Sequence, residues 1–230
     1  MEVKKNQAVL GAVLIGGLLG LLPGDARASG VELRLGALWP RADSILFKDD
    51  MTLYLVNKSD FVGVFGGIEF TKSISPNIEL ALSVEGYGRQ IGTSYRDFTR
   101  PSGGEIRQTI KFETVPTTGI VRFMPAGKYR KVTPYVGAGA SAVWWSYEEW
   151  GDFIDFQDPG RRIMSDSFKS TGTGFAMVAN GGLRYRLNTD MQVTADFRYF
   201  FGDDTMGGDF HPNKIDLSGP AVTLGFRMSF

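Results

Sequence analysis

Apolar and polar residues alternate along most of the chain beyond residue 30. In the first such segment, Val31, Leu33 and Leu35 share one face, and Glu32 and Arg34 share the other. A period of two residues indicates β-strands that have one apolar and one polar face. Eight segments of this kind are expected, at residues 31–39, 62–71, 78–85, 107–123, 133–147, 171–187, 193–201 and 222–230.

In two of the eight segments, the pattern does not show clearly which residues lie on the apolar face. In the fourth, the apolar face begins at Ile110 and Phe112, which would leave Arg122 on the apolar side of the strand unless the register shifts. A proline inside a strand usually marks an irregularity, so we expect a bulge near Pro116. In the fifth segment, the small residues of 135–140 leave the facing open.

The links between the segments alternate in length. Three shorter links, at 73–77, 124–132 and 188–190, are expected at one end of the sheet. The start of the first strand and the finish of the last strand are expected at the same end. Short turns at one end and long loops at the other are typical of up-and-down barrels in an outer membrane. A soluble barrel with an inward apolar face has the same period of two, so alternation alone does not decide between them. The four long links, at the other end, are 40–60, 90–106, 148–170 and 202–216.

The first 28 residues are typical of a secretory signal peptide. Lys4 and Lys5 precede an apolar run at residues 8–22, which is followed by the small residues Ala26 and Ala28. The run is fifteen residues long, whereas a membrane-spanning helix needs about 20. We therefore expect cleavage between Ala28 and Ser29, giving a signal peptide of residues 1–28 and one domain of residues 29–230.

Composition removes several classes of protein. The absence of cysteine excludes disulfides and thiol-based metal sites. The 25 basic and 25 acidic residues leave no net charge, which argues against nucleic acid as a partner. Export, alternating link lengths and a C-terminal phenylalanine together favour a membrane barrel over a soluble one.

The last strand carries a family resemblance. The tail ends with Phe226, Met228 and Phe230 at alternate positions and resembles the C-terminal assembly signal of bacterial outer-membrane barrels. Residues 29–230 are similar to the small eight-stranded barrels of the OmpA, OmpX and OmpW type, notably in residues 134–139 and 181–187. This generic resemblance implies an all-β, eight-stranded antiparallel up-and-down transmembrane β-barrel. It also implies contact with outer-membrane lipid and lipopolysaccharide, and insertion by the barrel-assembly machinery.

In such a barrel the polar strand faces point into the lumen. Eight strands enclose a space that side chains can fill, and an unpaired charge there would be costly. We expect the inward charges to form one connected network that blocks the lumen. The fourteen expected members are Glu32, Arg34, Glu69, Glu79, Glu85, Arg89, Lys111, Glu113, Arg122, Arg184, Arg186, Asp196, Arg198 and Arg227.

Aromatic residues cluster near the strand ends. Such rings prefer membrane interfaces, although aromatic residues also favour strands in general. At the short-turn end the candidates for an interfacial girdle are Tyr135, Tyr185 and Phe230. At the long-link end they are Trp39, Trp144, Trp145, Tyr147, Trp150 and residues 199–201.

Catalysis and cofactor binding are not expected. The single histidine, His211, lies in the last long link, with Ser218 and the acids Asp209 and Asp216 nearby. A hydrolase needs a histidine held against a nucleophile, and this spacing matches no lipid-modifying barrel motif. The acidic residues of the third and fourth long links lack the ligand spacing of a calcium loop, so no metal site is expected.

The second long link is rich in arginine. Two partners suit these side chains: the acidic third link, or lipopolysaccharide phosphates, which a guanidinium fork fits well. The sequence as a whole predicts a non-enzymatic integral outer-membrane protein with a structural or surface-interaction role in the envelope. The alternative is a narrow passive channel for small or hydrophobic solutes, as in the OmpW-like branch. A blocked or open lumen distinguishes the two.

Overall fold

The computed structural model describes residues 29–230. The expected signal peptide and its cleavage site after Ala28 lie outside the described residues, and Ser29 is the first residue of the fold. The strands are β1 (Ser29–Leu38), β2 (Gly63–Ser73), β3 (Ile78–Thr99), β4 (Glu105–Phe123), β5 (Val132–Ile154), β6 (Ile163–Arg186), β7 (Met191–Thr205), β8 (Lys214–Asp216) and β9 (Gly219–Ser229).

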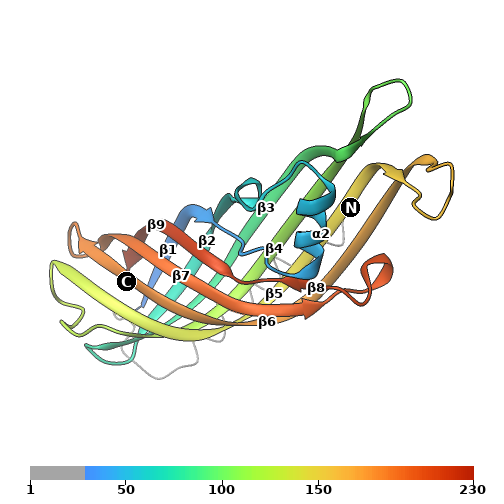
Figure 1. The fold of residues 1–230 in the computed structure, drawn as a ribbon. Coiled ribbons are helices and arrows are strands. Elements are labelled where there is room, and N and C mark those ends of the chain that lie inside the picture. The colour runs from blue at the N-terminus through green and yellow to red at the C-terminus, as the bar shows by residue number, and fades with distance from the viewer. Residues whose placement is uncertain (1–28) are drawn as a thin grey trace.

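Eight of the strands form a closed antiparallel ring. Each pairs with its neighbours along the chain, and β1 pairs with both β2 and β9, which closes the ring. β8 has only three residues and pairs with β7 beyond the ring. The two ends of the barrel chain meet, because the Phe230 amide donates to the Ser29 carbonyl oxygen at 3.0 Å. The predicted eight-stranded up-and-down barrel is confirmed (Figure 1).

The outer surface of the ring is apolar. Leu33 and Leu35 on β1 are 61% and 65% exposed, whereas the alternate residues Glu32 and Arg34 are buried in the lumen. Apolar side chains turned outwards around a closed ring suit lipid. The sequence left open which face of β5 points inwards. Between Thr133 and Glu149 all the buried residues are odd-numbered, so the odd-numbered face points into the lumen.

β4 contains no bulge at Pro116, so that prediction was wrong. Its register against β5 runs without a break through the Pro116–Val143 pair. Even-numbered residues are buried along the whole strand, so Ile110 and Phe112 point into the lumen on the same side as Arg122. The irregularity was inferred from the assumption that apolar residues face outwards, which fails in this part of the lumen.

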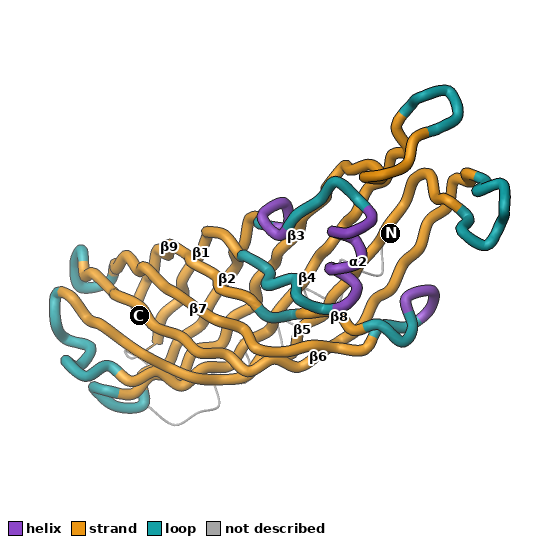
Figure 2. The backbone as a smooth tube through the Cα atoms, viewed as in Figure 1, coloured by secondary structure: helices purple, strands orange, loops and turns teal. Residues whose placement is uncertain are grey.

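Two of the long links are mostly strand. β3 and β4 continue to a turn at residues 100–104, and β5 and β6 continue to a turn at residues 155–162. A strand needs about 9–11 residues to cross a membrane, and β5 has 23. The two hairpins therefore extend well beyond the ring (Figures 1 and 2). An Arg100–Asp152 ion pair joins them, which is one of the two partners expected for the arginines of the second link.

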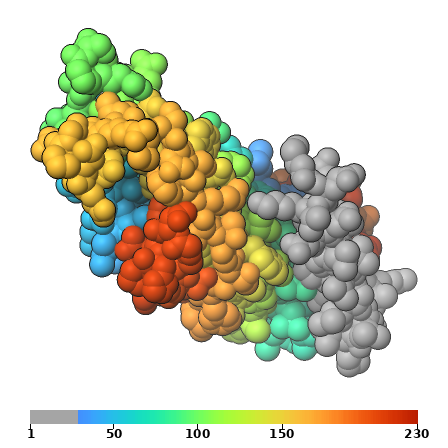
Figure 3. Space-filling view, turned by 90° about the vertical axis from the view of Figure 1, so that its right-hand side faces the viewer, coloured from blue at the N-terminus to red at the C-terminus, as the bar shows by residue number. Residues whose placement is uncertain are grey.

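The first long link folds over the mouth of the ring. It contains a helix, α2 (Ile45–Leu53), and a 3-10 turn, η2 (Lys58–Phe61); the last link contains the short turn η3 (Gly208–Phe210). In Figure 3 the blue first link lies between the yellow hairpin and the red last link. Among residues 29–230, the helices are too short or too polar to cross a membrane.

A closed ring predicts heat-modifiable migration on SDS gels. Each of the eight ring strands has a hydrogen-bonded neighbour on both sides within the ring, so the ring itself offers detergent no edge from which to open it. Unboiled protein should therefore run at a different position from boiled protein. Identical mobility of the two samples would contradict a closed barrel.

Candidate functional site

Ten of the fourteen expected lumen charges meet in one buried cluster, here called the lumen network. Its members come from seven strands and are each at most 5% exposed. Five carboxylates face five guanidinium groups, so the network is electroneutral. The members are Glu32, Glu69, Glu79, Glu85, Asp196, Arg34, Arg122, Arg184, Arg198 and Arg227.

Glu69 is the centre of the lumen network. Its carboxylate accepts from Arg34 Nη1 at 2.6 Å and from Arg122 Nη2 at 2.7 Å, and Arg198 donates to it as well. These arginines lie on β1, β4 and β7, so one side chain joins distant parts of the ring. Charge-assisted hydrogen bonds of this kind are stronger than neutral ones.

Glu79 forms a second centre. Arg184 donates to both of its carboxylate oxygens, at 2.9 and 3.2 Å, in a bidentate arrangement. Arg227 Nη1 donates to the same carboxylate at 2.9 Å. Arg122 Nη1 lies 3.5 Å from Glu79 and also binds Glu69, so it connects the two centres.

Neutral groups add further hydrogen bonds to the network. Asp196 accepts from Tyr135 Oη at 2.6 Å and from Asn180 Nδ2 at 2.7 Å. Glu85 accepts from Arg198 Nη1 at 2.6 Å and from Ser83 Oγ at 3.2 Å. Buried charges are stabilised only when such partners satisfy them. The network therefore holds each carboxylate against at least one guanidinium group.

Two glycines make room for the network. A Cβ atom at Gly225 would lie 2.3 Å from Glu32 Oε1, and one at Gly182 would lie 2.5 Å from Tyr135 Oη. Real Cβ atoms do not approach other atoms so closely, so a larger residue at either position would displace a network side chain. Gly182 and Gly225 therefore leave the space in which Tyr135 and Glu32 reach their partners in the lumen.

The other four expected members lie outside the network. Arg89 is exposed and donates to the Asp60 carbonyl oxygen at 2.7 Å. Lys111 and Glu113 face outwards on β4, where they pair with each other at 2.9 Å. Their strand keeps its even-numbered face inwards, because the expected bulge is absent. Arg186 reaches past the rim and binds main-chain oxygens of the turn after β4.

An aromatic plug lies above the network. Phe47 on α2 is fully buried, and its ring contacts those of Phe61, Phe112 and Tyr147 edge-on, with centroids 5.0, 5.7 and 5.9 Å apart. Phe112 and Tyr147 project inwards from β4 and β5. The first link thus fills the mouth of the barrel. Sequence reasoning missed this plug, although Leu46 and Phe47 are apolar residues within a loop.

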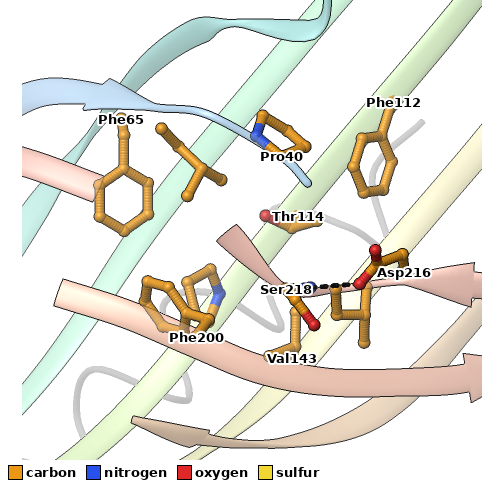
Figure 4. Close-up of a pocket in the computed structure, with 11 residues that line it drawn as sticks. Pro40, Phe65, Phe112, Thr114, Val143, Phe200, Asp216 and Ser218 are labelled. Carbon is orange, nitrogen blue, oxygen red and sulfur yellow. Dashed lines mark hydrogen bonds between the residues drawn. The ribbon is translucent and has the colours of Figure 1, made fainter. Parts of the chain in front are cut away.

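A small cavity lies between the network and the plug. Phe65 and Phe200 line this region from β2 and β7, with Thr114 and Val143 opposite them (Figure 4). The cavity measures about 20 Å³, which is room for about one water molecule. In this conformation, the lumen is closed by a charged layer and an apolar layer in series.

Several residues expected in the interfacial girdles instead fill the lumen. The rings of Trp39 and Trp144 and the Phe201 side chain are turned outwards and exposed, as expected at an interface. The inward residues are Tyr135, Trp145, Tyr147 and Phe200. The prediction that these four residues lie in an interfacial girdle was wrong. It considered how far along the strand each residue lies, but not whether its side chain points inwards or outwards.

The plug also buries acidic groups. Tyr147 Oη donates to Asp50 Oδ2 at 2.5 Å and lies 2.9 Å from Glu149 Oε1. Both carboxylates are 5% exposed, and no described cation forms an ion pair with either. Burial, and then repulsion by Glu149, raises the pKa of Asp50 well above its usual range.

The remaining candidate residues show no catalytic geometry. Ser218 Oγ donates to the Gly202 carbonyl oxygen at 3.0 Å, and the exposed His211 does not contact it. Phe226, Met228 and Phe230 all face outwards on the last strand or just after it. This exposure is compatible with their proposed role as an assembly signal.

Removing one network partner should destabilise the barrel strongly. Arg198→Ala would leave Glu85 and Asp196 short of a buried partner, which costs roughly 3–5 kcal/mol. Urea unfolding in lipid vesicles measures this loss. Arg107→Ala, which removes an exposed pair with Glu105, should cost at most about 1 kcal/mol. Equal losses for the two variants would contradict the network's contribution.

Docking of α2 should weaken as pH rises. The Asp50 carboxyl has a pKa of about 3.9 when solvated and a raised pKa when docked, so docking is strongest in acid and declines above pH of about 4. Hydrogen exchange in α2, corrected for the intrinsic rate at each pH, should therefore be faster at pH 8 than at pH 5, by about tenfold for each unit by which docking raises the pKa above 5. Asp50→Asn should weaken this dependence, leaving the part that comes from buried Glu149, whose pKa burial also raises. Asp49→Asn, at an exposed neighbour, should leave the dependence unchanged. Equal pH dependence in Asp50→Asn and the unmodified protein would refute it.

Comparisons with known proteins agree with this architecture. Residues 12–230 match the family model of the outer membrane protein beta-barrel domain. The outer membrane protein OprG from Pseudomonas aeruginosa is similar, with a TM-score of 0.57 and 14% identity over 90% of this chain and 98% of that chain. Neisserial surface protein A is also similar, with a TM-score of 0.51 and 17% identity over 90% of this chain and 100% of that chain. No curated protein sequence matches significantly. The chain therefore belongs to the outer membrane protein beta-barrel family and lies in the outer membrane.

Proposed function

We propose that this protein is a non-enzymatic, non-conducting barrel that stabilises the envelope and presents its outer hairpins for surface contacts. The observation that carries the proposal is the closed lumen. A solute crossing it would have to displace both the aromatic plug and an electroneutral set of buried ion pairs. Opening such pairs is costly, because each separated charge would remain in a poorly solvated space.

The outer hairpins support the surface-contact part of the proposal. β7 pairs with β6 only from Phe175 onwards. Within the described chain, no strand lies beside residues 163–174 on the side away from β5. The last link reaches only part of this edge, where the Gly207 amide donates to Ser170 Oγ at 3.1 Å. An uncovered strand edge can accept an extended segment of another molecule. Arg100 and Asp152 hold the two hairpins together, which favours a fixed surface over two independent loops.

Conductance in planar bilayers tests the proposal. The unmodified protein should give little or no steady current, because the plug and the network close the lumen in series. A known channel-forming porin in the same bilayers provides the positive control, and heat-modifiable migration verifies that the barrel is folded. Large, stable single-channel steps would overturn the proposal and favour a narrow passive channel for small or hydrophobic solutes.

A further inference from the structure

The turn between β4 and β5 carries a concentrated positive charge. Residues 124–132 contain Lys128, Arg130 and Lys131 and no acid. Arg130 and Lys131 are exposed, Lys128 is partly exposed, and none forms an ion pair with a described residue. Charges of one sign gathered on so short a turn repel each other unless an anion lies between them. We call these three residues the basic turn.

Arg186 fixes the backbone of the basic turn. Its guanidinium donates to the Tyr129 carbonyl oxygen at 3.1 Å and also to that of Lys128, and its amide donates to the Lys131 carbonyl oxygen at 2.8 Å. These bonds use main-chain oxygens, so they leave the side-chain charges of the turn unneutralised. A fixed backbone lowers the entropy lost when the three cations close on one ligand.

The basic turn borders the lipid-facing surface. Lys131 Nζ lies 5.5 Å from the centre of the Tyr185 ring. Tyr185, Val132 and Leu183 face outwards, 44–53% exposed, on the adjoining ends of β5 and β6. The cations thus lie where an apolar outer face ends, at the level that lipid headgroups occupy beside an aromatic interface.

The end of the barrel determines which lipid is reached. The short turns of outer-membrane barrels face the periplasm, so the basic turn lies at the inner leaflet. We propose that it binds an anionic glycerophospholipid of that leaflet, with the phosphate among the three cations and the acyl chains along Val132, Leu183 and Tyr185. Because the cations adjoin a surface that already faces lipid, a lipid can contact the charges and this apolar border together, whereas a soluble anion contacts the charges alone.

Lipid retention by the purified, refolded barrel tests the proposal. The protein is equilibrated in detergent with equal amounts of phosphatidylglycerol and phosphatidylcholine, and the bound lipid is measured by native mass spectrometry. The unmodified protein should retain phosphatidylglycerol preferentially. Each cation near an anionic surface contributes roughly a fivefold preference. The combined variant Lys128→Gln, Arg130→Gln, Lys131→Gln should therefore lower the preference by at least about tenfold, and by about a hundredfold if the three contributions add.

A matched control separates local binding from overall charge. Lys48→Gln, Arg107→Gln and Arg162→Gln remove three exposed cations at the other end of the molecule and should leave the preference unchanged. Heat-modifiable migration verifies that each variant is folded. An unchanged preference in the basic-turn variant, or equal losses in both, would overturn the proposal. Displacement of the lipid by glycerol phosphate or a soluble anionic polymer at equal concentration would also overturn it, in favour of a soluble polyanion.

Discussion

Electroneutrality of the buried lumen network is the constraint on which the rest of this structure depends. Charged side chains that leave water must each find a partner of opposite sign, and Glu69 does so with three arginines from three strands. Those contacts require the strands of the ring to hold their registers. A slip of one residue in any of these strands would turn the lumen charges of that strand towards lipid, so the network helps to specify the register of the barrel.

The inward face changes character along the barrel axis. On β4, Arg122 belongs to the charged layer, whereas Phe112 and Ile110, on the same face, pack beneath the plug. Within the lipid-spanning band, an apolar exterior forces polar residues inwards. Beyond that band the first link covers the mouth, and an apolar interior becomes favourable because α2 removes it from water. One strand therefore obeys two different patterning rules.

This change explains how far the sequence could be interpreted. Strand number, ring closure and the ten network charges follow from the alternation within the lipid band, where apolar means outward. Lys111 and Glu113 were assigned inwards because that rule was applied too far along β4. The extended hairpins were taken for loops, since their polar strands lack the strong alternation that lipid imposes. The plug depends on contacts between Phe47 and residues more than fifty positions away, which no local pattern contains.

The two ends of the barrel differ from its middle in the interactions that they can make with other molecules. The lumen network satisfies its charges internally, and the outer wall offers lipid little beyond apolar area. Groups that can reach a partner outside the barrel lie at its two ends: the edge of β6 that no strand covers, on the outer side, and the basic turn on the periplasmic side. At the outer edge these groups are backbone amides and carbonyls, and at the basic turn they are side-chain cations. Recognition at the two ends should accordingly differ, with extended polypeptide suited to the first and anionic headgroups to the second.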